Sequence, residues 1–341
     1  MGWRFHKRIK LFSGVTMNLG KNGSSFSFGP RGAKVTVGKN GVRKTIGIPG
    51  TGLSYSTYDR FDNSERGSSR ATSSAPKNTI DVGFISGLFM SGDEKIFVEA
   101  VKQMLNGNIP AALNGFEKIP QIADAAFIAA VLYLNNRQYN DCAAAIENAL
   151  KNSSGLGALF RKYNLDIDLS VAITDFFSIN LQPSPTALYL IKVEMLQQQR
   201  NISQACNLLI SLYKSDPANL TVKISLAELV LSTPGNSAWL KTLLGMTNNI
   251  ENDSPVHTVL LFYRGIVLKE MNLYDAAQTV LSTAGRKKKD RDPELLLAIM
   301  EERAEIYQLQ GQKSSARKMW EKIYAENPYH PDAQAKIKSL S

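Results

Sequence analysis

The chain has little of what metal sites, disulfides and catalytic centres are made from. It holds two cysteines and three histidines in 341 residues, and no histidine has a second ligand at metal spacing. No Ser/His/Asp, Cys/His or paired-carboxylate arrangement can be read from it. We therefore expect no metal, no cofactor, no catalytic residue and no enzymatic activity. Cys142 and Cys206 are predicted to be small buried thiols of a reducing cytoplasm.

Long hydrophobic runs are missing as well. The best candidate, "TIDVGFISGLFM" at residues 79–90, contains Asp81 and is shorter than the ~20 residues that cross a bilayer. The segment 81–92 is predicted to dock on the helix that follows it, with a membrane-surface role as the alternative. The predicted location is the cytoplasm, and attachment at the inner face of the membrane stays open.

Acidic residues are absent from the first 58 positions. This segment holds ten Lys and Arg and no Asp or Glu, whereas the rest of the chain holds 30 of each sign. Such an asymmetry indicates an anionic partner rather than a particular fold. The candidate anion-binding residues are Arg4, Lys7, Arg8, Lys10, Lys34 and Arg43.

Short alternating runs fill residues 15–58, and Asn-Gly and Pro-x-Gly turns separate them. Because glycine supplies the positive φ of tight turns, this pattern predicts a small antiparallel β-meander over residues 1–58. The glycine-rich stretch "IGIPGTGLSYS" at 46–56 lacks the Lys-Ser/Thr pair and the helix of a phosphate-binding loop. We interpret it as a hairpin turn.

Three phrases of this segment resemble a known family. "GWRFHKRIKL", "MNLGKNGSSFSFGPRGAKVTVGKNG" and "IGIPGTGLSY" are similar to the module catalogued as domain-of-unknown-function family 4236. The resemblance covers roughly residues 1–57. It implies a bacterial setting and no biochemical activity.

Residues 59–80 are rich in serine and in charges of both signs, and are predicted to be a flexible linker. From residue 93 to 341 the pattern has the period of helices. Small residues recur at matching offsets where two helices of a hairpin would cross closely. The clearest of these close-contact positions are Ala112, Cys142, Ala205, Gly265, Ala277, Ala304 and Ala316. One degenerate hairpin is expected between Cys142 and Ala205, and another around residues 226–244.

Residues 93–335 resemble tetratricopeptide repeats, with Ala304, Tyr307, Gly311, Ala316 and Trp320 in the clearest unit. The resemblance implies a groove that is lined by the first helix of each hairpin and binds a protein or peptide. The Lys/Asn/Arg set that clamps a peptide carboxylate in chaperone-binding members is not at these positions. The main partner-groove candidates are Phe97, Val101, Phe127, Val131, Leu190, Glu194, Phe262, Lys269, Glu301 and Glu305.

The predicted fold class is α+β and multidomain: a small amino-terminal antiparallel β-meander followed by a carboxy-terminal, all-α, tetratricopeptide-like solenoid. The predicted function is that of a non-enzymatic adaptor or scaffold. The helical array would bind a protein or peptide, and residues 1–58 would bind an anionic partner. The alternatives are a nucleic-acid-binding protein that acts through residues 1–58 and a peripheral membrane or envelope-associated assembly factor. The Glu301/Glu305 end of the groove favours a basic segment.

Overall fold

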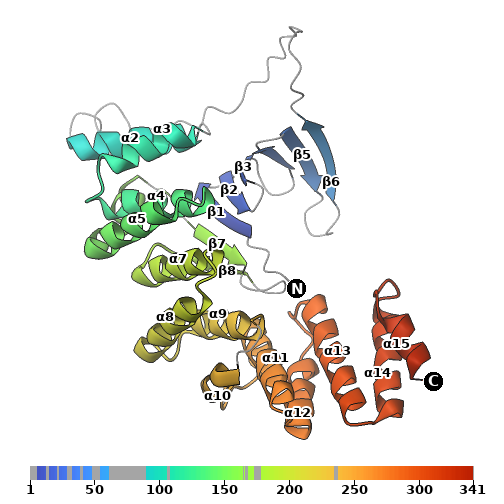
Figure 1. The fold of residues 1–341 in the computed structure, drawn as a ribbon. Coiled ribbons are helices and arrows are strands. Elements are labelled where there is room, and N and C mark those ends of the chain that lie inside the picture. Colours follow the sequence, from blue (N-terminus) through green and yellow to red (C-terminus); the bar gives the residue numbers. More distant parts are fainter. Residues whose placement is uncertain are drawn as a thin grey trace. The chain divides into compact units, whose positions relative to one another are not determined.

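The computed structural model describes most of the chain beyond residue 90 and the strands before it. The described residues are 6–12, 15–20, 23–28, 33–38, 41–47, 54–60, 90–105, 108–163, 165, 168–172, 178–233 and 237–340. Arg4, residues 61–80 of the predicted linker and most of the segment at 81–92 lie outside the described residues, whereas residues 59 and 60 of that linker belong to β6. The chain divides into two compact units, one containing helices α2–α7 and the other helices α8–α15 (Figure 1).

Eight strands form one antiparallel ladder in the order β6-β5-β4-β3-β2-β1-β7-β8. Their bounds are β1 (His6–Phe12), β2 (Val15–Gly20), β3 (Gly23–Phe28), β4 (Ala33–Gly38), β5 (Gly41–Gly47), β6 (Ser54–Arg60), β7 (Asp168–Ala172) and β8 (Ser178–Leu181). Strand β7 pairs with β1 in the register Arg8 to Ser170 and Lys10 to Asp168. The ladder therefore joins the start of the chain to a segment near its middle.

The predicted fold class is wrong. Residues 90–104, 108–163, 182–233 and 238–340 form helices and the turns between them, and this part of the chain contains no strand. The strands do not form a small, separate amino-terminal meander, because β7 belongs to the same ladder. The part of the chain whose side chains are described is all-helical, and its helices form an array of hairpins.

Within its described residues, the first unit contains two helix pairs, one short helix and the helix α7. The helices are α2 (Gly92–Leu105), α3 (Ile109–Glu117), α4 (Ala123–Asn135), α5 (Tyr139–Lys151), α6 (Ala158–Lys162) and α7 (Pro185–Gln198). Helix α2 packs on α3, α4 packs on α5, and α7 packs on α4 and α5. Helix α4 is buried along almost its whole length, because it lies between the first hairpin and α7.

Helix α6 replaces the degenerate hairpin that was predicted between Cys142 and Ala205. It begins after Gly157, whose φ of 81° is left-handed, and its first N–H groups point at the buried carboxylate of Asp124 on α4. Asp124 accepts hydrogen bonds from the backbone of Gly157, Leu159 and Phe160, the last two at 2.7 and 3.2 Å. A side chain more than thirty residues away thus satisfies the orphan donors of this helix.

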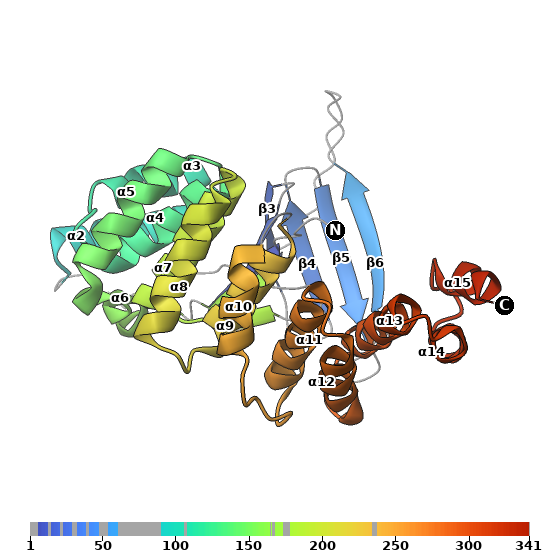
Figure 2. The ribbon, with the colours of Figure 1, turned by 60° about the horizontal axis from the view of Figure 1, so that its bottom comes forward.

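The second unit continues the pattern of paired helices. Its helices are α8 (Ile202–Ser215), α9 (Leu220–Leu231), α10 (Ser237–Met246), α11 (Pro255–Glu270), α12 (Tyr274–Arg286), α13 (Pro293–Leu309), α14 (Lys313–Glu326) and α15 (Ala333–Ser339). Helix α11 packs on α12 and α13 packs on α14, side by side in both ribbon views (Figures 1 and 2). The hairpin expected around residues 226–244 is confirmed by α9 and α10, which pack on each other.

Small residues at the contact positions allow the paired helices to approach closely, as the sequence predicted. The close-contact positions Ala112, Cys142, Ala205, Ala277, Ala304 and Ala316 are all fully buried. At Gly265 on α11, an added Cβ would lie 2.4 Å from the Leu281 side chain of α12. At Gly115 on α3, it would lie 2.7 Å from the Cβ of Ala100 on α2. The close packing of these two hairpins therefore requires glycine, which has no side chain, at Gly265 and Gly115.

Candidate partner-binding face

Helices α11 and α13 are the first helices of consecutive hairpins, and both begin with the same capping arrangement. Ser254 and Asp292 are the N-cap residues, and a proline follows each at the first helical position. The Asp292 carboxylate accepts from the backbone of Glu294 at 2.8 Å, and the Ser254 hydroxyl accepts from that of His257 at 3.3 Å. A side-chain cap and a proline therefore define where each of these helices begins.

An ion-pair cluster links the two helices. The ammonium of Lys269, in the last turn of α11, contacts carboxylate oxygens of Glu302 and Glu305 on α13, the second at 3.0 Å. Lys269 is only 14% exposed, so its charge is largely removed from water. We call Lys269, Glu301, Glu302 and Glu305 the charged face.

Burial and charge compete at this cluster. Burial would lower the pKa of Lys269, but the two carboxylates outweigh it and raise that pKa. Burial raises the pKa of Glu302, and the neighbouring Glu305 and Glu301 push it in the same direction against Lys269. The cluster therefore has more negative charge than its single ammonium balances.

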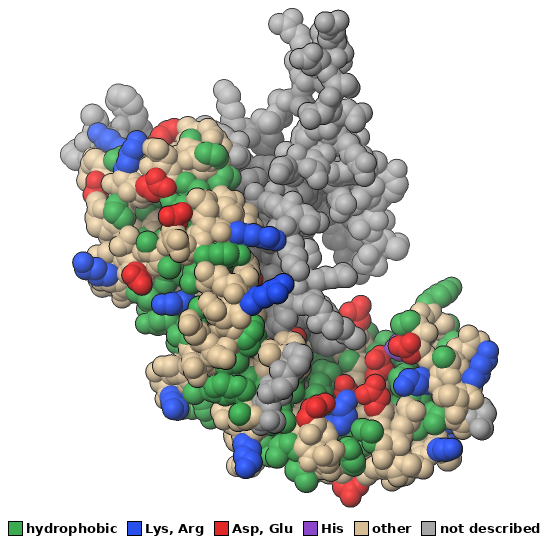
Figure 3. Space-filling view, viewed as in Figure 1, with side chains coloured by type: hydrophobic (Ala, Val, Ile, Leu, Met, Phe, Trp, Pro, Cys, Tyr) green, Lys and Arg blue, Asp and Glu red, His purple; other side chains and the backbone are tan. Residues whose placement is uncertain are grey.

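The third carboxylate, Glu301, does not contact Lys269 but pairs with a histidine. Its Oε1 lies 2.8 Å from Nε2 of His330, in the loop before α15. Glu301 and Glu305 remain 35% and 45% exposed. Acidic side chains gather beside basic ones on this part of the surface (Figure 3). The charged face thus presents three carboxylates against one ammonium and can attract a cationic segment.

Three of the predicted groove residues, Lys269, Glu301 and Glu305, lie on the charged face. Glu302 was missed, because the repeat pattern places positions 301 and 305 inward and 302 beside them. The long, flexible stem of Lys269 brings Glu302 into the cluster from the neighbouring helix. The signal that could have identified it is the run of acidic residues at 301 and 302 after a lysine on the previous hairpin.

In the first unit, the structure places Phe97, Val101, Phe127 and Val131 in the core, each at most 2% exposed. Phe160 of α6 covers this region: its ring centroid lies 6.1 Å from that of Phe97 and 6.4 Å from that of Phe127. A helix that the repeat pattern does not contain therefore occupies the space beside these side chains. Their role as partner contacts stays a prediction.

The remaining groove candidates are buried or half-buried and present no exposed charge. Glu194 of α7 is buried and accepts a hydrogen bond from Gln198 at 2.7 Å. Leu190 on the same helix is half-buried. Phe262 of α11 is buried, and its ring lies 5.6 Å from that of Tyr263. We base the site on the charged face for this reason.

The anion-binding candidates lie in strands. Lys7, Arg8 and Lys10 belong to β1, Lys34 belongs to β4 and Arg43 to β5. Lys34 pairs with Thr45, and Arg43 pairs with Thr36, in one antiparallel register. Anion binding by these residues stays a prediction.

The described residues offer no grouping of three or more His, Cys, Asp or Glu that could hold a metal ion. None of the described helices is both long and apolar enough to span a bilayer. Both cysteines are buried and belong to no disulfide, and burial raises the pKa of Cys206 to about 11. Cys206 is therefore a protonated thiol at neutral pH.

The paired helices define the described part of the chain as a helical-repeat protein. Residues 3–56 match the family model described as "Protein of unknown function (DUF4236)". No curated protein matches the chain.

Several solved structures are similar to this chain. A thermophilic TPR protein from Thermus thermophilus is 16% identical, with a TM-score of 0.35, over 73% of this chain and 98% of that one. BtubC from P. vanneervenii is 12% identical, with a TM-score of 0.43, over 71% and 95%. NprR in complex with its cognate peptide NprX is 11% identical, with a TM-score of 0.31, over 73% and 70%. Because these TM-scores are low, the assignment to helical repeats rests on the hairpins themselves.

Proposed function

We propose that this protein is a non-enzymatic adaptor whose helical array binds a protein or peptide partner through the charged face. A second, anionic partner would bind residues 1–58. The observation that supports the first contact is the charged face itself, where two carboxylates of α13 contact the ammonium of Lys269 and a third, that of Glu301, pairs with His330. A cationic, extended segment of a partner would neutralise the excess negative charge of these carboxylates.

The chemistry of the charged face favours binding over catalysis. Its carboxylates pair with Lys269 and His330, so they are held as a recognition surface. Repeat arrays gain binding surface with each added hairpin, since neighbouring hairpins stack into a continuous face. A charged face of this kind can recognise a partner by charge and by the spacing of the partner's side chains.

The test uses two peptides of equal length, one rich in lysine and leucine and the other with glutamate in place of lysine. Fluorescence anisotropy should show that the full chain binds the basic peptide and not the acidic one. Glu301→Gln with Glu305→Gln should weaken binding by about ten-fold or more, because two exposed interfacial charges are removed. Higher salt should weaken binding to the unaltered protein.

The matched control is Glu321→Gln with Glu326→Gln on α14. Both glutamates are exposed, and the change in net charge is the same. This variant should bind the basic peptide as the unaltered chain does. Equal losses in the two double variants would show that only net charge matters and would reject the charged face as the binding site.

A second candidate function, nucleic-acid binding through residues 1–58, is favoured by ten cations without one acidic residue. It is compatible with the adaptor role, because it concerns the other partner.

A further inference from the structure

The last described helix, α15, is capped at its start by one histidine. His330 lies in the loop between α14 and α15, and its side chain is 9% exposed. Its Nδ1 accepts hydrogen bonds from the backbone N–H groups of Asp332 and Ala333, each at 3.2 Å. Asp332, the N-cap residue of α15, makes no side-chain cap of its own. The imidazole thus takes the place of the missing cap.

These contacts assign one protonation state to the ring. A nitrogen that accepts two N–H groups must offer a lone pair, so Nδ1 carries no proton. The other nitrogen, Nε2, lies 2.8 Å from Oε1 of Glu301 and donates to that carboxylate. The neutral imidazole with its proton on Nε2 satisfies every one of these contacts.

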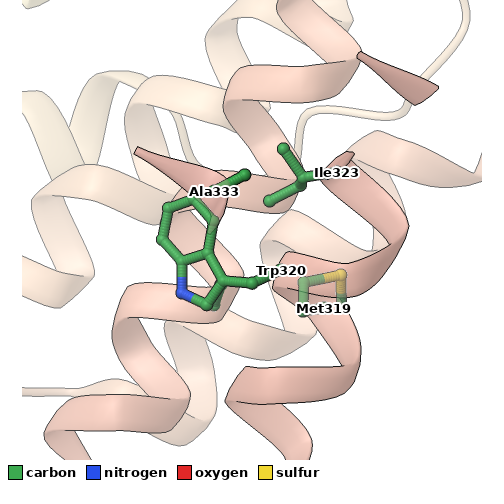
Figure 4. Close-up of a cluster of buried hydrophobic side chains, with 5 residues drawn as sticks. Met319, Trp320, Ile323 and Ala333 are labelled. Atoms are coloured by element: carbon green, nitrogen blue, oxygen red, sulfur yellow. The ribbon is translucent and has the colours of Figure 1, made fainter. Parts of the chain in front are cut away.

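Helix α15 covers the end of the core of the second unit. Ala333 is fully buried beside Met319, Trp320 and Ile323 of α14 (Figure 4), and Ile337 and Leu340 pack against the same cluster. Trp320 is 2% exposed. Its ring centroid lies 6.0 Å from that of His330. Release of α15 would therefore uncover a tryptophan and an apolar patch on α14.

We propose that His330 is a pH-sensitive latch that keeps α15 docked while the ring is neutral and releases it when the ring is protonated. A proton on Nδ1 would point at two backbone N–H groups, at the positive end of a helix. The two cap hydrogen bonds would be replaced by repulsion between the Nδ1 proton and the two backbone N–H groups. When α15 is undocked, this repulsion is absent, because water solvates the imidazolium.

Some charged groups around His330 favour protonation of the ring, and others oppose it. Glu301 of α13 attracts an imidazolium and weakens the switch. Lys336 of α15, whose Nζ lies 5.8 Å from the Trp320 ring centroid, adds positive charge on the side of α15. From α14, the described contact of the ring is with Trp320, which carries no charge. Asp332 is linked to the ring through its backbone N–H. For the latch to open, the loss of the two cap bonds at Nδ1 must outweigh the attraction by Glu301.

The test measures hydrogen exchange of the full chain between about pH 7.5 and about pH 5.5, corrected for the intrinsic rate at each pH. An imidazole in water takes up its proton near pH 6.5. Linkage then allows a fall of up to about ten-fold in the protection of residues 331–340 over this range. The peptide from α12 should keep its protection, which separates release of α15 from unfolding of the unit.

Two variants identify the group that titrates. His330→Gln keeps an oxygen that can accept from the cap N–H groups but cannot be protonated, so protection of α15 should become flat with pH. The matched control, His257→Gln on α11, removes another half-buried imidazole and should leave the fall unchanged. Persistence of the fall in His330→Gln, or its loss in His257→Gln, would overturn the proposal.

A direct measurement covers the case in which His330→Gln leaves α15 undocked at every pH. In the unaltered protein, nitrogen NMR of the imidazole should show the Nε2–H form at about pH 7.5. Protonation of this ring should coincide with the loss of protection in α15. An imidazolium that coexists with a fully protected α15 would show that the cap bonds do not decide docking, and the latch would be rejected.

Discussion

At the scale of single residues, the distance between the helices of a hairpin is limited by side-chain size. Gly265 leaves no room for a methyl group, since its Cβ would lie 2.4 Å from Leu281. We predict that Gly265→Ala destabilises the protein by about 1–2 kcal/mol, the cost of overpacking less the gain in helix propensity. Chemical denaturation of the purified protein measures the difference.

Gly245 is the matched control for this substitution. It also lies in a helix, α10, but no heavy atom lies within 4 Å of a Cβ built there. Gly245→Ala should therefore be neutral or stabilising by up to about 1 kcal/mol. Equal effects at the two glycines would show that close packing at Gly265 does not limit the hairpin.

The residue scale also shows what the sequence could predict. Small residues recur because the two helices of a hairpin must approach each other at fixed points, and this constraint produces a regular pattern in the sequence. The capping of α6 by Asp124 produces no such pattern, because the acceptor and its donors are more than thirty residues apart. The burial of Phe97 and Phe127 was missed for the same reason, since Phe160 of the unexpected α6 fills the space beside them.

At the scale of elements, Lys269 connects α11 to α13. Lys269→Met would leave Glu302 and Glu305 without their ammonium partner in a half-buried site. We predict a loss of about 1–3 kcal/mol at pH 7, less than for a fully buried pair because Glu305 is 45% exposed. Urea denaturation at several pH values measures it.

The pH dependence of this variant has a defined sign. Burial already raises the pKa of Glu302, and removing Lys269 raises it further. The folded state then binds a proton more tightly than the unfolded state, so stability rises as the pH falls through the raised pKa. The destabilisation should shrink between about pH 7 and about pH 5.

Lys318→Met on α14 is the control, because this lysine is exposed and belongs to none of the ion pairs of the charged face. It should change stability by less than about 0.5 kcal/mol at either pH. A deficit of Lys269→Met that stays constant with pH would contradict the role of the carboxylates.

The element scale also explains the error in the fold class. Alternation and Asn-Gly turns predict strands but do not reveal their neighbours, so the pairing of β1 with β7 could not be anticipated. The segment between Cys142 and Ala205 was expected to be helical because the repeat spacing left room for a hairpin. The chain instead uses that length for α6, β7 and β8.

At the scale of the whole molecule, charge is segregated along the chain. The first 58 residues have ten cations and no acid, while the charged face of the second unit has three carboxylates and one ammonium. In the proposed adaptor role, these two regions would hold two partners of opposite charge without either competing for the other's site. Both proposed contacts are electrostatic, so each should weaken with salt independently of the other.

The anionic partner can be tested by removing three cations from β1. We predict that Lys7→Gln, Arg8→Gln and Lys10→Gln together weaken binding of the full chain to a labelled single-stranded oligonucleotide between about 50 and about 200 mM salt, with a salt slope lower by about 2. Lys287→Gln, Lys288→Gln and Lys289→Gln remove the same charge from an exposed loop and should leave binding unchanged. Equal losses in both triple variants would reject a dedicated site in residues 1–58. Binding to anionic vesicles but not to the oligonucleotide would identify a membrane surface as the partner instead.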